Sequence, residues 1–159
     1  MPLHSKWNGS DGLDILDDGN IIGGTTTAER NVISGNNASG IFASAGSNNT
    51  IQGNYLGLNS LGTGDIGNGS HGLQIRTADN QIGGSNPDEG NVISGNGSTG
   101  ITIASAGADG TQIQGNLIGT DASGSFAVRN TGISGIHIIE GATNSVIGGT
   151  NAEDRNVIA

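Results

Sequence analysis

The sequence predicts an all-β fold, a right-handed parallel β-helix with three sheets and about five coils, in a single domain over residues 1–159. Three short segments recur in the same order along the chain, and each alternates apolar and polar residues as a strand with one buried face does. Gly, Asn and Ser separate the segments, as is typical of tight corners. A repeat of 28 to 35 residues with this content indicates a solenoid.

The first segment is a Gly followed by two apolar residues with one residue between them, and it predicts the first sheet. One apolar column of this sheet is Leu13, Ile41, Leu73, Ile101 and Ile136, and the other is Ile15, Ala43, Ile75, Ile103 and Ile138. We expect both columns to face the core.

The second segment is Ile followed by Gly or Gln and then Gly, and the third begins with Asn and has Ile or Leu two positions later. They predict a second sheet with the inward column Ile22, Ile51, Ile82, Ile113 and Ile147, and a third with Ile33, Leu56, Ile93, Ile118 and Ile158. Equivalent strands should pair in parallel about 4.8 Å apart. The crossover between parallel strands favours right-handed winding.

The asparagine that begins each third segment has a structural interpretation. A corner between strands often needs left-handed backbone, which Gly and Asn tolerate best. Stacked asparagines can also satisfy buried backbone groups through an amide ladder. We therefore expect a ladder of Asn31, Asn54, Asn91, Asn116 and Asn156.

Loops of two kinds alternate from coil to coil. The first, third and fifth coils carry six-residue loops at 25–30, 85–90 and 150–155, and their charged residues predict a solvated, salt-bridged edge. The second and fourth coils carry long loops at 60–71 and 122–134. Apolar residues of the long loops are expected to fold back as a satellite cluster: Leu61, Ile66, Phe126, Val128 and Ile133. Residues 1–12 are expected to form a degraded half-coil, with Trp7 as a lid.

The runs Asn-Val-Ile-Ser-Gly-Asn at 91–96, Gly-Ile-Thr-Ile at 100–103 and Ile-Gly-Gly-Thr at 147–150 carry a resemblance. They resemble the parallel β-helix repeats of the pectin-lyase-like superfamily, particularly those of long secreted bacterial proteins. The resemblance covers about Leu13 to Ile158 and implies an extracellular or cell-surface location. Because this superfamily contains lyases, hydrolases, epimerases, adhesins and non-catalytic stalks, it leaves the activity open.

Enzymes of that superfamily commonly work on the outer face of the first sheet. His137, Arg76 and Asp14 are the catalytic candidates there, with His137 as a general base. Phe42, Gln74 and Thr102 are the binding candidates. A hydrolase would need paired carboxylates at close range, and a lyase-like site implies several calcium-binding carboxylates with a basic residue. The outward residues of this sheet match neither pattern.

Charge and composition limit the partners. The formal charge of −9 disfavours nucleic acid and anionic membranes, and no apolar run is long enough to insert into a membrane. No cofactor or metal site is predicted.

The sequence favours a non-catalytic scaffold, stalk or adhesive segment of a larger extracellular bacterial protein. The alternative is a polysaccharide-active enzyme or a carbohydrate-binding module that uses the first sheet. The pattern stops within the fifth coil after Ile158, as expected for part of a longer solenoid, so partners are expected to include a second copy bound through the C-terminal coil, and a polysaccharide.

Overall fold

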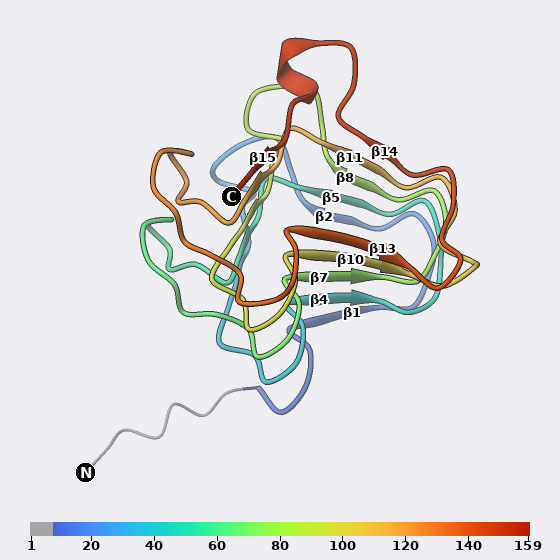
Figure 1. Cartoon of the computed structure of the whole chain (residues 1–159), viewed down its shortest axis with the longest axis horizontal. Coiled ribbons are helices and arrows are strands. Elements are labelled where there is room, and N and C mark those ends of the chain that lie inside the picture. The colour runs from blue at the N-terminus through green and yellow to red at the C-terminus, as the bar shows by residue number, and fades with distance from the viewer. Residues whose placement is uncertain (1–7) are drawn as a thin grey trace.

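The computed structural model describes residues 8–159 and shows three parallel sheets wound into a β-solenoid (Figure 1). The strand order of the first sheet is β1-β4-β7-β10-β13, so successive neighbours are one coil apart in the sequence. The chain makes four turns between β1 and β13 and then adds one strand to each of the other sheets. The predicted all-β solenoid with three sheets is confirmed. The expected lid residue Trp7 lies outside the described residues.

The strands are short and have nearly the bounds that the repeat predicts. The first sheet contains β1 (Leu13–Ile15), β4 (Ile41–Ala43), β7 (Leu73–Ile75), β10 (Ile101–Ala104) and β13 (Ile136–Ile139). The second contains β2 (Ile21–Gly23), β5 (Thr50–Gln52), β8 (Gln81–Gly83), β11 (Gln112–Gln114) and β14 (Val146–Ile147). The third contains β3 (Val32–Ile33), β6 (Tyr55–Leu56), β9 (Val92–Ile93), β12 (Leu117–Ile118) and β15 (Val157–Ile158).

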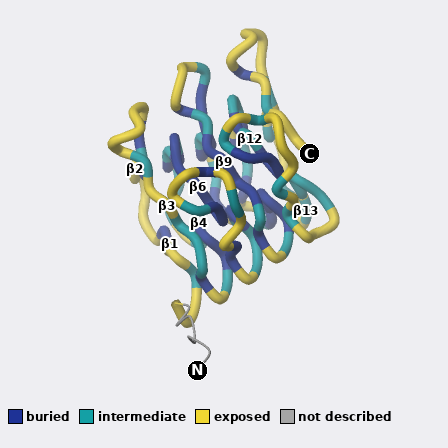
Figure 2. Tube along the Cα trace, turned by 90° about the vertical axis from the view of Figure 1, so that its left-hand side faces the viewer, coloured by how far each residue is buried: buried dark blue, intermediate teal, exposed yellow. Residues whose placement is uncertain are grey.

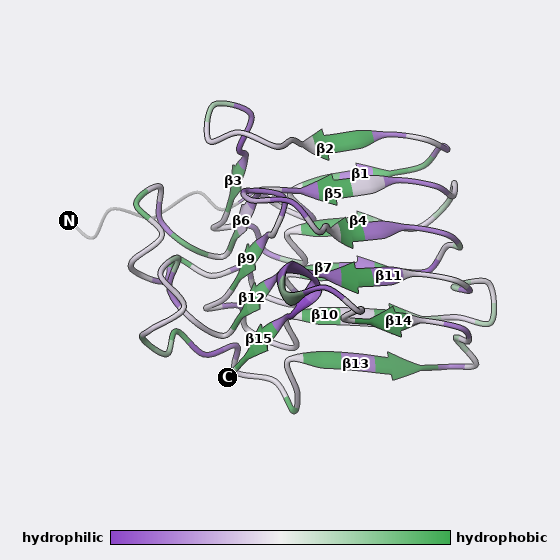
Figure 3. Cartoon of the chain, turned by 90° about the horizontal axis from the view of Figure 1, so that it is seen from above, coloured by the Kyte–Doolittle hydropathy of each residue, from purple (hydrophilic) through white to green (hydrophobic). Residues whose placement is uncertain are grey.

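The core is built from the predicted apolar columns. Ile101 pairs in register with Leu73 on one side and Ile136 on the other, and Ile113 pairs with Ile82 and Ile147. Ile101 and Ile113 are fully buried. Figure 2 shows the buried strands inside the coils and the exposed loops projecting from them, and Figure 3 shows the apolar character of the strands. Stacked aliphatic side chains therefore supply the main apolar burial of the fold.

Each corner of the coil carries a row of hydrogen-bonded asparagines. At the corner before the third sheet, each Nδ2 group donates to the Oδ1 atom of the next asparagine at 2.9–3.1 Å; the row is Asn31, Asn54, Asn91, Asn116 and Asn156. At the corner after the third sheet, the row is Asn36, Asn68, Asn96 and Asn130. At the corner before the second sheet, it is Asn20, Asn49 and Asn80. The last two rows were not predicted.

The row at the corner before the second sheet ends after three coils. Thr111 and Ser145 occupy its next two positions, and their buried hydroxyl groups have no hydrogen-bond partner. Asn80 instead donates its Nδ2 group to the backbone carbonyl and the hydroxyl of Thr77. A threonine or serine side chain is too short to replace the amide that would continue the row.

The long loops do not fold back as expected. Leu61, Ile66, Phe126 and Ile133 are exposed, and Val128 alone of the five packs against a small apolar cluster. The reason is that each loop closes on its own polar residue. Asn59 Oδ1 accepts from the backbone N–H groups of residues 61 and 63, and Asp121 Oδ1 accepts from those of residues 125 and 126. The two loops project side by side from the solenoid (Figure 1).

The edge formed by the six-residue loops is largely exposed to solvent, as expected, but its carboxylates accept hydrogen bonds within their own loops in place of the expected salt bridges. Glu29 Oε2 accepts hydrogen bonds from the hydroxyl of Thr26 at 2.8 Å and from the backbone N–H groups of residues 25 and 26 at 3.0 Å. These bonds, the Thr26 hydroxyl first, hold the pKa of Glu29 below its usual value. Glu89 accepts an equivalent hydrogen bond from the backbone N–H of Asn86. Asp154, which lies in the 3-10 turn η1 (Ala152–Asp154), accepts one from the backbone N–H of Asn151.

Candidate functional site

The outer face of the first sheet holds five of the six predicted site residues in one column, and Arg76 lies in the next outward column, directly after β7. Strand pairing places Asp14 beside Phe42, and Thr102 between Gln74 and His137. Asp14 lies on β1 and His137 on β13, at opposite edges of the sheet. Four strand spacings correspond to about 19 Å, so the carboxylate of Asp14 and the imidazole of His137 cannot act on one bond.

The structure adds His71 to this face. Its Nδ1 atom lies 3.1 Å from the Thr102 hydroxyl, and burial lowers its pKa, with the charge of the nearby His137 acting in the same direction and a backbone hydrogen bond to Thr99 opposing both. Sequence reasoning missed His71 because it ends a long loop. Alignment of the coils would place it with Ser39 and Thr99, immediately before a first-sheet Gly, as the one imidazole in that column.

The remaining first-sheet candidates do not extend this pair into a catalytic group. Arg76 is exposed, and its Cζ atom lies 5.8 Å from the centroid of the Phe42 ring. Thr102 is only 3% exposed, so its hydroxyl is not available as a nucleophile. Within residues 8–159, no group of three or more His, Cys, Asp or Glu side chains is placed to hold a metal ion. The face can offer hydrogen bonds and a cation–aromatic pair to a ligand.

A second candidate site lies on the outer face of the third sheet, where the outward column is apolar. Tyr55 pairs with Val92, and Val92 pairs with Leu117. The six-residue loops rise along one side of this column and the long loops along the other (Figure 3). Between them is a cavity of about 350 Å³, which we call the third-sheet cavity.

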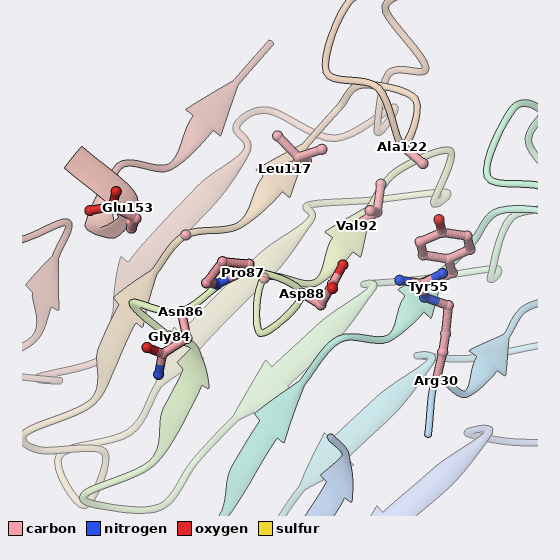
Figure 4. Close-up of a pocket in the computed structure, with 12 residues that line it drawn as sticks. Arg30, Tyr55, Gly84, Asn86, Pro87, Asp88, Val92, Leu117, Ala122 and Glu153 are labelled. Atoms are coloured by element: carbon pink, nitrogen blue, oxygen red, sulfur yellow. The ribbon is translucent and has the colours of Figure 1, made fainter. Parts of the chain in front are cut away.

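One end of the third-sheet cavity is formed by Arg30 and Tyr55 (Figure 4). The Arg30 Nε atom donates to the carbonyl oxygen of Gly53 at 2.9 Å, and its Cζ atom lies 4.2 Å from the centroid of the Tyr55 ring. Both contacts fix the plane of the guanidinium group. Its two terminal Nη groups donate to no other group in the described part of the chain.

The loop 85–90 forms the wall beside Arg30. Glu89 accepts from the backbone N–H and the side-chain amide of Asn86 at 2.9 Å, which closes the loop. Asp88 has a left-handed backbone with φ of 67° and lines the cavity. Glu153 stands at the far end, and Figure 4 shows Pro87, Asp88 and Val92 between it and Arg30.

The space exists because of two features of the repeat. Gly90 occupies the position that is Arg30 in the first coil, and a Cβ atom there would collide with the carbonyl oxygen of Gly115. Arg30 packs over the Tyr55 ring of the next coil. Gly90 has no side chain, so nothing at this position packs over Leu117 in the same way. The fourth coil also has no six-residue loop, so the space next to Gly115, between the loops 85–90 and 150–155, stays open.

Sequence reasoning did not identify the third-sheet cavity. The signal was the outward position of the third segment, which is apolar in every coil: Val32, Tyr55, Val92, Leu117 and Val157. A strand that is apolar on both faces is covered on both faces, and here the long loops supply the partial second cover.

Comparisons with protein-family models, curated proteins and solved structures find no match for this chain. The three-sheet solenoid therefore rests on the sequence and the structure themselves. Among the described residues, no helix has the length and apolar character to cross a membrane.

Proposed function

We propose that this chain is a non-catalytic scaffold or stalk segment of a larger extracellular protein. The observation that carries the proposal is the set of three asparagine rows along the solenoid axis. Asn54, Asn91 and Asn116 are fully buried, and each is hydrogen-bonded to the coil on either side. Such rows join neighbouring coils and resist bending, which suits a spacer. The resemblance of the repeats to those of secreted proteins is the support for the proposed extracellular location.

The arrangement of the first-sheet face also supports a structural role. A hydrolytic site needs an acid and a base on either side of one bond. Of the three catalytic candidates His137, Arg76 and Asp14, the acidic Asp14 and the proposed base His137 lie on the two edge strands of the sheet. The pair formed by His71 and Thr102 contains a buried hydroxyl, and within residues 8–159 neither side chain is hydrogen-bonded to a carboxylate.

A carbohydrate-binding role for the first sheet is the second candidate. The observation that favours it is the neighbouring placement of Phe42 on β4, Gln74 on β7 and Arg76 directly after β7. An aromatic ring with a cation and an amide beside it can hold a polar ring-shaped ligand.

The two roles are separated by a screen of neutral and acidic polysaccharides, with and without calcium, for unsaturated or shortened products and for binding. The scaffold proposal expects no product. Arg76 is exposed and His137 is partly exposed. Arg76→Ala and His137→Ala should each change the free energy of unfolding by about 0.5 kcal/mol or less, as for other surface substitutions, and should leave binding unchanged.

Product formation that either substitution abolishes, while the thermal midpoint stays constant, would replace the scaffold proposal with an enzymatic one. Loss of binding without any product would support the carbohydrate-binding role of the first sheet.

A further inference from the structure

We infer that the third-sheet cavity binds a neutral saccharide. Its floor is apolar and consists mainly of the half-buried Leu117, with the edges of Val92 and of the Tyr55 ring, which are 5% and 8% exposed, beside it. A ligand that covers this floor needs an apolar face of its own, because burying unpaired polar groups against it would be unfavourable. The C–H face of a sugar ring meets this condition.

The rim of the cavity requires both acceptors and donors on the ligand. Arg30 supplies N–H donors in a fixed plane, and Asp88 and Glu153 supply carboxylate acceptors. Neighbouring hydroxyl groups can accept from the guanidinium and donate to a carboxylate at the same time. A purely anionic or purely cationic ligand would satisfy one of these groups and be repelled by the other.

Charge then selects a neutral ligand over an acidic one. One guanidinium and two carboxylates line the cavity, so its net charge is −1, and the whole chain carries −9. A uronate would meet a favourable contact at Arg30 and unfavourable ones at Asp88 and Glu153. The cavity volume of about 350 Å³ lies near the lower end of the range for small-ligand sites, roughly 300–1,000 Å³, which suits one or two sugar rings.

The site is held in shape before a ligand arrives. Arg30 is fixed by Gly53 and Tyr55, and the loop that carries Asp88 is closed by Glu89. Fixed groups lose little conformational freedom on binding, which favours affinity. The site is separate from the first-sheet face and does not depend on the scaffold proposal.

The experiment uses Tyr55 as a reporter, because it is the only tyrosine of the chain. The chain is labelled with ¹³C-tyrosine, and its ring signals are followed by NMR during titration with neutral oligosaccharides of glucose, xylose and mannose, and with galacturonic acid oligomers. We expect at least one neutral oligosaccharide to shift these signals with saturation, and to bind more tightly than the uronate oligomers.

Two substitutions test the rim groups. Arg30→Gln and Asp88→Asn should each weaken binding about tenfold or more, the effect of losing a charge-assisted hydrogen bond. Asn tolerates the left-handed backbone of residue 88, so the loop should keep its shape.

Matched controls use the same chemical changes outside the cavity. Arg155→Gln alters the equivalent loop position in the fifth coil, and Asp79→Asn alters another exposed aspartate with positive φ. Both should leave the dissociation constant unchanged within about twofold, since neither contacts the cavity.

The inference is overturned if none of the oligosaccharides shifts the Tyr55 signals, if the uronates bind more tightly than every neutral sugar, or if Asp88→Asn binds like the unsubstituted chain. If Arg30→Gln lowers the thermal midpoint, its loss of binding could reflect a loss of structure, because Arg30 also contacts Gly53 and Tyr55. The binding measured for Asp88→Asn then tests the inference by itself.

Discussion

Ile103 illustrates how strictly the repeat fixes an inward position. Its side chain is fully buried and pairs in register with Ile75 and Ile138 in the same column. Ile103→Asp should prevent folding, because a carboxylate without a partner would lie inside an aliphatic column. Ile103→Val removes one methylene and should lower the free energy of unfolding by about 0.5–1.5 kcal/mol. Thermal unfolding followed by circular dichroism measures both.

The valine variant is the control, since it keeps the shape and the apolar character of the site. A folded Ile103→Asp variant with a thermal midpoint near that of the original chain would contradict the inward orientation.

Inward residues could be read from the sequence for a simple reason. Every inward position of the repeat needs an apolar side chain. The alternation of apolar and polar residues therefore identifies Ile41, Ile51 and Leu56 as inward residues without knowledge of the partner strands. Outward residues are under no such common constraint. The contact between His71 and Thr102 joins two coils, and it depends on how a long loop ends, which alternation cannot describe.

At the scale of the structural element, the asparagine rows differ between their middle and their ends. Asn91 is fully buried; its Oδ1 atom accepts from the backbone N–H and the amide of Asn54, and its Nδ2 group donates to Ile51 and Asn116. Asn31 is exposed and its side chain makes one bond, to Asn54 Oδ1 at 2.9 Å.

Asn91→Ala should therefore lower the free energy of unfolding by about 3 kcal/mol or more, because it leaves several buried donors and acceptors unpaired. Asn31→Ala, which removes one bond at an exposed position, should cost about 1 kcal/mol or less. Urea unfolding of both variants gives the comparison. Equal losses for the two would mean that burial does not set the strength of the row.

The two unpredicted rows show why element-level reasoning from the sequence stopped short. Asn31 and its equivalents begin a recurring segment, so their spacing within the repeat is constant. Asn68 and Asn130 lie in the long loops, whose insertion shifts their position relative to Asn36 and Asn96. The structure shows that both long loops return to the same corner, which brings Asn68 and Asn130 into one row with Asn36 and Asn96.

At the scale of the whole molecule, the sequence revealed that two kinds of loop alternate, but not the space that they enclose. The third-sheet cavity depends on Gly90 in place of an arginine, and on lining residues that come from the loops of the first, third and fifth coils. The apolar residues of the long loops illustrate the same limit. Composition suggested burial, whereas the internal bonds of Asn59 and Asp121 keep Leu61 and Phe126 exposed.

The last coil supports a prediction about association. Ile147 and Ile158 are 47% and 51% exposed, although Ile113 and Ile118 in the same columns are fully buried. The edges of β13, β14 and β15 also present unpaired backbone groups. Apolar side chains beside an open parallel edge favour pairing with another strand, either tail to tail in a closed dimer or head to tail in a filament.

We therefore expect the average mass of this chain to rise with concentration in static light scattering. A variant with a polar capping coil appended after Ala159 is the control, and it should remain monomeric, because the cap covers the columns that end in Ile147 and Ile158. Ile147→Ser would test the same surface without lengthening the chain, and it should weaken association by removing apolar area from the interface. A chain that stays monomeric at high protein concentration, with or without the cap, would show that the edges of the last coil do not bind a second copy.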